Sequence, residues 1–381
     1  MREDQQSEMV ARLREPDPYK RWSYAARTMR NPAAHYVDPV WFEDEKTALF
    51  RGQPQFVGLS VECGAAGDYL TRDCGGIPIL IMRQRDGALK AFVNACRHRA
   101  APLLDGEGRH GRRPIVCPYH AWTYDLDGHL LARPHSDGAF NDIDVPCDLA
   151  ARAVSEARGL IFVHPTSADP FAVADLLHGM DGEFAGYGIE TAHRIERRET
   201  VLPINWKLLL DTFLEAYHVR SVHRHSIDKT FLSHQLFDGF GPSARVIGLR
   251  RSAMEQGDED RLFPHAAAVY VLLPNALLTY QGDHIETWRF EPIDTFTTRA
   301  ITTIFAPAEP ETEKALLHWQ RNFEILCKVA FEEDFPIQQR IQNVLRSGAV
   351  DHVYYGRLEP ALIHCHTAIN RIVEAWRANG S

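Results

Sequence analysis

The sequence predicts an α+β protein in which an all-β domain is inserted between an N-terminal arm and a larger domain of antiparallel strands and helices. Two sequence patterns, one in each half of the chain, predict this class. Short strand-like runs joined by tight turns occupy residues 57–164, and longer patterns of helical period alternate with strand-like runs after residue 165. We therefore expect an arm with its joining helix at 1–44, the inserted domain at 45–165 and the larger domain at 166–381.

The composition is that of an ordinary globular protein and argues against several classes. Of 381 residues, 45% are hydrophobic and 24% are charged, and no apolar run approaches the roughly 20 residues that span a bilayer. The net charge of -9 argues against a nucleic-acid or anionic-membrane partner, because phosphates attract an excess of Lys and Arg. The charged N-terminus lacks the apolar core of a signal peptide, and seven Cys are too sparse for a disulfide-rich chain, so we expect a cytoplasmic protein.

Turn and capping residues define the elements of the first half. The first 35 residues are polar and indicate an arm that is either poorly ordered or packed on another surface. Asp38 and Pro39 predict the start of a short helix that runs to about Arg51. Two Asp-Gly pairs predict β-hairpins, because this dipeptide suits the tight turn between strands. The predicted strand pairs are Ile77–Arg83 with Ala91–Asn94 and Ala121–Tyr124 with Leu130–Ala132.

The second half alternates strands with longer helices. An apolar stripe predicts one helix from Trp206 to about Val222. The other predicted helices are Phe171–Leu177, Glu313–Phe331, Ile337–Leu345 and Ile363–Ala378. The predicted strands are Ile195–Leu202, Ser243–Leu249, Ala268–Leu273, Leu277–Tyr280, His284–Phe290 and Thr298–Phe305. Strands backed by helices predict an α+β domain here.

Two loops of the inserted domain each pair a Cys with a His at chelating separation. Cys96 and His98 form a C-x-H unit, and after 18 intervening residues Cys117 and His120 form a C-x-x-H unit. If the loops converge, one iron gains two thiolates and a second iron gains two imidazoles, the two-Cys, two-His [2Fe–2S] arrangement. A tetrahedral zinc site is the alternative, although zinc fingers pair Cys with Cys and His with His along the chain.

The segments around these loops resemble a Rieske domain. RDGALKAFVNACRHRAAPL and CPYHAWTYDLDGHL are similar to the large subunit of the Rieske non-haem iron oxygenases, the aromatic-ring-hydroxylating family. The resemblance implies that Cys96 and Cys117 hold the inner iron of a [2Fe–2S] Rieske cluster and that His98 and His120 hold the outer iron. For the larger domain it implies a helix-grip-like catalytic fold with a central antiparallel sheet flanked by helices.

The segment NWKLLLDTFLEAYHVRSVH contains a second group of possible ligands, among them Glu215, His218 and His223. On a regular helix, a step of five residues puts the two His about 140° apart, so they could not both reach one metal. A break or a π-bulge between Val219 and Val222 would bring them together. Geometry alone therefore leaves open both a metal site and an ordinary cluster of His.

The resemblance extends to this segment and to FEEDFPIQQRIQ. It implies that His218, His223 and Asp334 are the two-His, one-carboxylate ligands of a mononuclear Fe(II), with positions left open for O2. Two alternatives remain for the acidic segment. Asp334 could cap the helix that starts near Pro336, or Glu333 could be the ligand instead.

Glu215 departs from the family, which usually has Asp at this position. In the family that Asp joins a mononuclear-iron His to a Rieske His of the neighbouring subunit. The resemblance therefore implies that Glu215 is an electron bridge between subunits, from His120 of one to His218 of the next. A carboxylate can accept from two imidazole N–H groups despite the extra methylene of Glu. Some relatives that oxidise quaternary amines such as carnitine also carry Glu here.

The resemblance implies an oxygenase that takes electrons one at a time from its Rieske cluster and uses Fe(II) with O2 beside an organic substrate. It further implies a homotrimer, or a multiple of three, and a separate NAD(P)H-dependent reductase or ferredoxin. The segments predicted to line the pocket are apolar or aromatic, which suits an aromatic ring or a methylammonium group. We expect hydroxylation of an aromatic compound. The alternative is a monooxygenase or N-/O-demethylase acting on a quaternary amine (carnitine- or betaine-like) or a methoxy compound.

Two hypotheses from other classes remain to be distinguished from an oxygenase. A Rieske electron carrier without oxygenase activity would have no use for a second iron with open positions. A zinc-stabilised binding module would be colourless, whereas a Rieske protein is red-brown.

Overall fold

The computed structural model describes residues 1, 3–142, 145–254, 261–263 and 265–380. The chain divides into two units, one from Phe50 to Val173 and one that combines Met1–Leu49 with Ala174–Ser381. The second unit is therefore discontinuous in sequence and resumes after the first is complete. Among the helices of the described residues, none combines the length and the apolar composition that crossing a bilayer requires.

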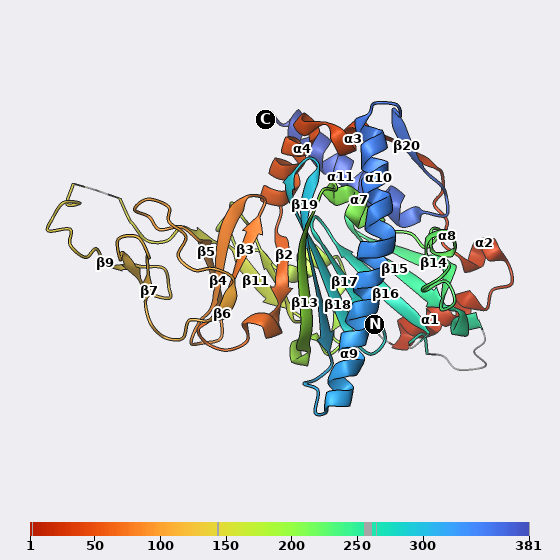
Figure 1. The fold of residues 1–381 in the computed structure, drawn as a ribbon, viewed down its shortest axis with the longest axis horizontal. Helices are drawn as coiled ribbons and strands as arrows, with labels where there is room; N and C mark the ends of the chain where they lie inside the picture. Colours follow the sequence, from red (N-terminus) through yellow and green to blue (C-terminus); the bar gives the residue numbers. More distant parts are fainter. Residues whose placement is uncertain (2, 143–144, 255–260, 264, 381) are drawn as a thin grey trace. The chain divides into compact units, whose positions relative to one another are not determined.

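Short strands joined by turns build the unit Phe50–Val173 (Figure 1). They form a five-stranded sheet in the order β10-β5-β4-β3-β6 and two three-stranded sheets, β11-β12-β2 and β7-β8-β9. Both predicted hairpins are confirmed, as β4–β5 and β8–β9, and the turn residues Gly87 and Gly128 have positive φ. The strands are β2 (Gln55–Leu59), β3 (Asp68–Cys74), β4 (Ile77–Arg83), β5 (Leu89–Val93), β6 (Glu107–Arg109), β7 (Ile115–Val116), β8 (Thr123–Tyr124), β9 (Leu130–Ala132), β10 (Ala151–Arg152), β11 (Val154–Ala157) and β12 (Leu160–Val163).

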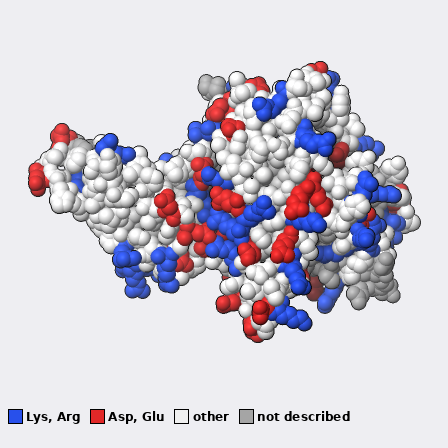
Figure 2. Space-filling model, viewed as in Figure 1, with Lys and Arg blue, Asp and Glu red and all other residues white. Residues whose placement is uncertain are grey.

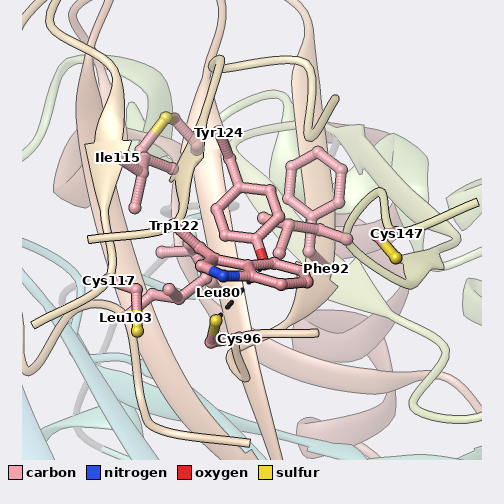
Figure 3. Packing of buried hydrophobic residues seen from close by; sticks show 11 residues of the cluster. Leu80, Phe92, Cys96, Leu103, Ile115, Cys117, Trp122, Tyr124 and Cys147 are labelled. Atoms are coloured by element: carbon pink, nitrogen blue, oxygen red, sulfur yellow. Dashed lines mark hydrogen bonds between the residues drawn. The ribbon is translucent and has the colours of Figure 1, made fainter. Parts of the chain in front are cut away.

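One hydrophobic cluster of this unit encloses the two predicted Cys ligands. Figure 3 shows Leu80 of β4 and Tyr124 of β8 in the same cluster as Trp122. Cys96 and Cys117 are members of it and are 4% and 3% exposed. The thiols therefore lie in apolar surroundings, which disfavour a bare thiolate.

A seven-stranded antiparallel sheet forms the centre of the discontinuous unit, in the order β13-β19-β18-β17-β16-β15-β14. The predicted central antiparallel sheet is thus confirmed. The strands are β13 (His193–Leu202), β14 (Phe231–Phe240), β15 (Ser243–Arg250), β16 (Ala266–Leu272), β17 (Ala276–Tyr280), β18 (Ile285–Asp294) and β19 (Thr297–Ala306). Sequence reasoning missed β14, because Ser233, His234 and Gln235 interrupt its apolar pattern.

Helices flank this sheet, and the residues of the second predicted metal site lie next to the ends of two of them. Helix α9 contacts β13 and β19, and α7 contacts β18 (Figure 1). The bounds are α5 (Val173–Leu177), α6 (Asp181–Phe184), α7 (Trp206–Asp211), α8 (Val219–Val222), α9 (Glu313–Lys328), α10 (Phe335–Arg346) and α11 (Pro360–Ala378). A π-helical segment, Val329–Asp334, joins α9 to α10. The predicted α+β class is confirmed.

The N-terminal arm is packed, which is one of the two alternatives that its polar sequence left open. Helix α1 (Glu3–Leu13) buries Met9, Val10 and Leu13, and β1 (Met29–Pro32) pairs with β20 (His352–Tyr355). The predicted short helix is also confirmed. It consists of α4 (Pro39–Glu45) followed by a π-helical segment, and Asp38 caps it by accepting a hydrogen bond from the N–H of Val40 at 2.9 Å. The short helices α2 (Pro18–Arg21) and α3 (Ala34–Val37) complete the arm.

The prediction of one helix from Trp206 to Val222 is wrong. Helix α7 ends at Asp211, and the N–H groups of Phe213 and Leu214 donate to carbonyls three residues back. The chain then turns until α8 begins at Val219. Tight turns of this kind end a helix because they replace the four-residue hydrogen-bond step. This break lies directly before the predicted iron ligands.

Ion pairs on the surface contribute little to this fold. Charges of both signs are interspersed on the face of the molecule that Figure 2 shows. Arg197 of β13 and Arg299 of β19 each approach Glu199 at 3.2 Å. Exposed pairs of this type contribute only about 0–1 kcal/mol each. The pair of Glu45 and Lys207 differs, because both side chains are almost fully buried and their charged atoms lie 2.6 Å apart.

Two candidate metal centres

The two Cys–His loops adopt the same backbone conformation. In each loop the N–H of an alanine donates to the carbonyl of the Cys four residues earlier, from Ala100 to Cys96 at 2.9 Å and from Ala121 to Cys117 at 3.0 Å. Both alanines are left-handed, with φ of 58° and 56°. Non-glycine residues rarely adopt this conformation, and such strain clusters at functional sites. The structure thus presents one Cys and one His from each of two matching turns.

The sulfur end of this centre is enclosed, and a tyrosine hydroxyl approaches one of its thiols. Tyr124 places its hydroxyl 3.3 Å from Cys96 Sγ, as drawn in Figure 3, and accepts a hydrogen bond from the N–H of Arg97 at 3.0 Å. Burial raises the pKa of the Cys96 thiol. A thiolate here therefore needs a compensating positive charge, which iron supplies. Sequence reasoning did not single out Tyr124, since nothing in its spacing distinguishes it from a core aromatic residue.

The histidine end faces outward. The rings of His98 and His120 are 4.6 Å apart, and Trp122 stacks on His98 at 5.0 Å. His120 is exposed. His98 Nδ1 is buried and has no hydrogen-bond partner among the described residues, so its nitrogen is available to a metal. Enclosed thiols with outward imidazoles fit a [2Fe–2S] cluster that has its His-bound iron nearer to solvent.

The second centre brings together the three predicted ligands of the mononuclear iron. Asp334 Oδ1 lies 3.0 Å from His223 Nε2 and 3.6 Å from His218 Nε2. One ligand atom from each residue lies within 4.8 Å of the other two. His223 and Asp334 are buried and His218 is half-buried. Two imidazoles and one carboxylate on one side of a metal leave its other positions open, as in non-haem Fe(II) oxygenases.

Two irregular segments make this convergence possible. His218 directly precedes the four-residue helix α8, and His223 follows it with non-helical φ and ψ of −101° and 23°. The predicted break between Val219 and Val222 is absent, because these residues form α8, and the chain leaves helical geometry only at His223, where that helix ends. Asp334 ends the π-helical segment Val329–Asp334, before Pro336 in the first turn of α10. π-Helical turns displace side chains from the regular stripe and occur frequently at functional sites.

Each histidine of this centre is held by a carboxylate on its other nitrogen. Glu215 Oε1 lies 2.5 Å from His218 Nδ1, and its Oε2 accepts from the backbone N–H of His218 at 3.0 Å. Glu333 Oε2 lies 2.6 Å from His223 Nδ1. Glu333 is thus on the side of the ring away from Asp334, which does not fit the alternative of Glu333 as the ligand. Carboxylates on metal-bound His fix the ring orientation and the tautomer.

The electrostatics of the second centre suit a divalent cation. Burial lowers the pKa of His223, but hydrogen bonds and charges from Asp334 and Glu333 outweigh this effect, so the pKa is raised. The same carboxylates therefore favour a proton on His223 when the metal is absent. Because a metal binds neutral imidazole, a cation would take the place of that proton.

The His364, Cys365 and His366 group is not brought together as a metal site. His366 Nε2 lies 2.7 Å from Asp211 Oδ1, and His364 Nε2 lies 3.0 Å from the carbonyl of Ser243. Cys365 is fully buried, and burial raises the pKa of its thiol. The two imidazoles therefore have separate partners.

Comparisons with known families follow the same division of the chain. Residues 53–147 match the family described as Rieske [2Fe-2S] domain, and residues 189–375 match the one described as ring hydroxylating alpha subunit (catalytic domain). The chain belongs to the Rieske non-haem iron oxygenases, as the large (alpha) subunit. It is therefore an O2-dependent oxidoreductase whose cofactors are a [2Fe–2S] Rieske cluster and a mononuclear Fe(II).

Two relatives that resemble the chain over most of its length are described as monooxygenases. The carnitine monooxygenase oxygenase subunit of Escherichia coli (strain K12) is 30% identical over 325 residues, covering 83% of this chain and 84% of that protein. The chloroplastic choline monooxygenase of Arabidopsis thaliana is 26% identical over 358 residues, covering 90% of this chain and 83% of that protein.

Solved structures share the fold. A quaternary ammonium Rieske monooxygenase in complex with L-carnitine has a TM-score of 0.78 at 24% identity, covering 92% of this chain and 95% of that one. Naphthalene 1,2-dioxygenase from Rhodococcus sp. has a TM-score of 0.73 at 16% identity, covering 100% of this chain and 99% of that one. At these identities the likeness describes the fold alone.

Proposed function

We propose that this protein is the oxygenase component of a system that monooxygenates a quaternary amine. The observation that carries the proposal is the similarity, over more than four-fifths of the chain, to subunits that oxidise carnitine and choline. Glu215 supports it, since some relatives that act on quaternary amines carry Glu at this position. The sequence leaves quaternary-amine oxidation open as the alternative to aromatic hydroxylation, and we now prefer that alternative. Among the relatives reported above, those at least 25% identical to this chain are described as acting on carnitine or choline, and none as acting on an aromatic compound.

The assignment of residues to the two cofactors is part of the proposal. Cys96 and Cys117 would hold the inner iron of the cluster, and His98 and His120 the outer one. His218, His223 and Asp334 would hold the mononuclear iron. When bound, the cluster supplies single electrons and the mononuclear iron supplies a place for O2 beside the substrate.

Glu215 is proposed to connect the two centres across subunits. It already fixes His218 through Nδ1, and its carboxylate retains lone pairs for a second imidazole N–H. Such a bridge requires the Rieske domain of a neighbouring copy, so a homotrimer and a separate NAD(P)H-dependent reductase or ferredoxin belong to the proposal. A cytoplasmic location belongs to it as well, because the reductase consumes NAD(P)H.

The rings of a largely buried aromatic cluster, two of them close to Asp334 in the sequence, are proposed to border the substrate. The Trp288 ring lies 5.2 Å from Phe213 and 5.8 Å from both Phe331 and Phe335, and the last two flank Asp334 in sequence. Aromatic faces attract quaternary ammonium ions through their quadrupole. The same rings would also accommodate an aromatic substrate, which keeps aromatic hydroxylation as the second candidate.

A substrate comparison tests the two candidates directly. Protein with both cofactors would be reduced chemically, exposed to O2, and incubated with carnitine, glycine betaine, choline, indole or naphthalene. We expect a product containing one added oxygen atom, or its cleavage products, from a quaternary amine only. Asp334→Ala is the control, with intact cluster absorbance and no product. Oxidation of indole or naphthalene with no turnover of the amines would refute the proposal.

A further inference from the structure

The Glu333 side chain connects the two segments that carry the proposed iron ligands. It belongs to the π-helical segment before α10, whereas His223 follows α8, 110 positions earlier in the chain. Glu333 Oε2 is 2.6 Å from His223 Nδ1. The neighbouring Asp334 reaches the opposite nitrogen, Nε2, of the same ring at 3.0 Å. Two successive carboxylates therefore contact the two nitrogens of one imidazole.

A serine holds the Glu333 carboxylate in this position. Ser226 donates its hydroxyl to the same Oε2 atom at 2.6 Å. The backbone N–H of Ser226 donates to the carbonyl of His223 at 3.0 Å, so the serine belongs to the turn that His223 begins. The carboxylate is therefore oriented by two donors from one turn, and its position does not depend on a single contact.

These contacts determine which nitrogen of His223 can bind a cation. Neutral imidazole carries one N–H and one lone pair. When Nδ1 keeps the hydrogen and donates it to Glu333, the lone pair is on Nε2 and points toward Asp334. Without an acceptor at Nδ1 the ring can exchange tautomers and rotate, which weakens the site for a metal.

We propose that Glu333, oriented by Ser226, is a positioning residue that fixes the tautomer and ring orientation of His223 and connects the two ligand segments. The inference rests on the proposed iron site of His218, His223 and Asp334. Glu215 performs the equivalent task for His218 from within one turn of chain. Glu333 orients His223 from the other ligand segment. Removing the Glu333 carboxylate therefore loosens the two ligand segments relative to each other.

Metal affinity of the full-length protein tests this role without turnover. Co(II) and Fe(II) would be titrated anaerobically against a chelator into wild type, Glu333→Ala, Glu333→Gln and Ser226→Ala. We expect Glu333→Ala to bind one ion with about 10–100-fold lower affinity, the range found when carboxylates that support metal-bound His are removed. Glu333→Gln keeps an acceptor oxygen, so its loss should be smaller, and Ser226→Ala should be the mildest.

Two controls separate positioning from folding and from direct ligation. Glu332→Gln changes an exposed neighbour on the same π-helical segment and should leave affinity unchanged. The melting temperature of the metal-free protein and the absorbance of the cluster would be recorded for every variant. Unchanged metal affinity in both Glu333 variants would overturn the inference, as would a fall in melting temperature with no fall in affinity.

Asp334→Ala distinguishes failure of this inference from failure of the proposed site. If Glu333→Ala abolishes stoichiometric binding as completely as Asp334→Ala, Glu333 is a ligand and the positioning role is wrong. If Asp334→Ala binds the metal as wild type does, the proposed iron site itself is wrong. The expected order of affinity is wild type, then Ser226→Ala, Glu333→Gln, Glu333→Ala, and Asp334→Ala last.

Discussion

Glu45 is the acceptor for four hydrogen bonds inside the discontinuous unit. Its carboxylate receives Trp41 Nε1 at 2.7 Å, Trp206 Nε1 at 3.0 Å and Lys207 Nζ at 2.6 Å on each oxygen. Glu45 is completely buried, and Lys207 is 1% exposed. The contacts connect α4 of the N-terminal arm to α7, which precedes the segment of the proposed iron ligands.

The substitution Glu45→Ala leaves an ammonium and two indole N–H groups buried without their acceptor. Removing one partner of a buried ion pair costs about 3–5 kcal/mol, and each unsatisfied donor adds roughly 1 kcal/mol. Burial lowers the pKa of Lys207, so deprotonation relieves part of this cost. We therefore expect the free energy of unfolding to fall by ~4 kcal/mol, a large fraction of the ~5–15 kcal/mol typical of a domain.

Urea unfolding of the purified holoprotein, followed by tryptophan fluorescence, measures this loss. Glu43→Ala is the matched control on the same helix. Its side chain is 63% exposed and pairs with Lys46 at 3.5 Å, so the change should cost no more than about 0.5 kcal/mol. A loss below about 1 kcal/mol for Glu45→Ala would refute the view that this carboxylate stabilises the unit through a buried charge.

Other residues give predictions of different kinds. Burial lowers the pKa of His284, but hydrogen bonds and charges from Asp283 and Glu286 outweigh this effect and raise the pKa to about 9. The charged His284 side chain therefore stabilises the fold fully below pH 6.5, and this stabilisation is lost as pH rises through 9. The difference in unfolding free energy between wild type and His284→Asn should thus shrink by ~3 kcal/mol between about pH 6 and 10, and a constant difference would contradict it. Cys96→Ser should abolish the red-brown colour and the paramagnetic signal of the reduced cluster, and a fully coloured variant would remove Cys96 from the ligand set. Glu215→Ala should keep both metals while single-turnover oxidation of the cluster slows by roughly 10–100-fold, and transfer at the wild-type rate would exclude the bridge.

The sequence predicted the structure best where the function requires particular residue types close together in one loop. The C-x-H and C-x-x-H units need no knowledge of the fold to indicate a metal, because each ligand pair lies in one loop. The Asp-Gly hairpins are similar, since the turn chemistry is local. Both features are present in the structure, with the loops of Cys96 and Cys117 in matching conformations.

The second centre could not be derived from helical periodicity, because it depends on departures from it. The apolar stripe after Trp206 continues past Asp211, although the chain does not stay helical. Nothing local in the sequence indicates that the turn before His218 or the π-helical segment before Phe335 forms. Both segments make tertiary contacts that local sequence patterns do not reveal, such as the one between Glu333 and His223. Resemblance to a family supplied what local propensity could not.

The pairing of β1 with β20 has a consequence for the order of events during synthesis. Met29 pairs with Tyr355, so the arm leaves the ribosome long before its partner strand exists. Residues 50–173 emerge in between and can fold as a unit of their own. If residues 50–173 have already folded, less conformational entropy is lost when β1 pairs with β20. The reason is that much of the chain between the two strands no longer samples open conformations. Nascent chains that fail to fold the insert should therefore close the outer unit more slowly.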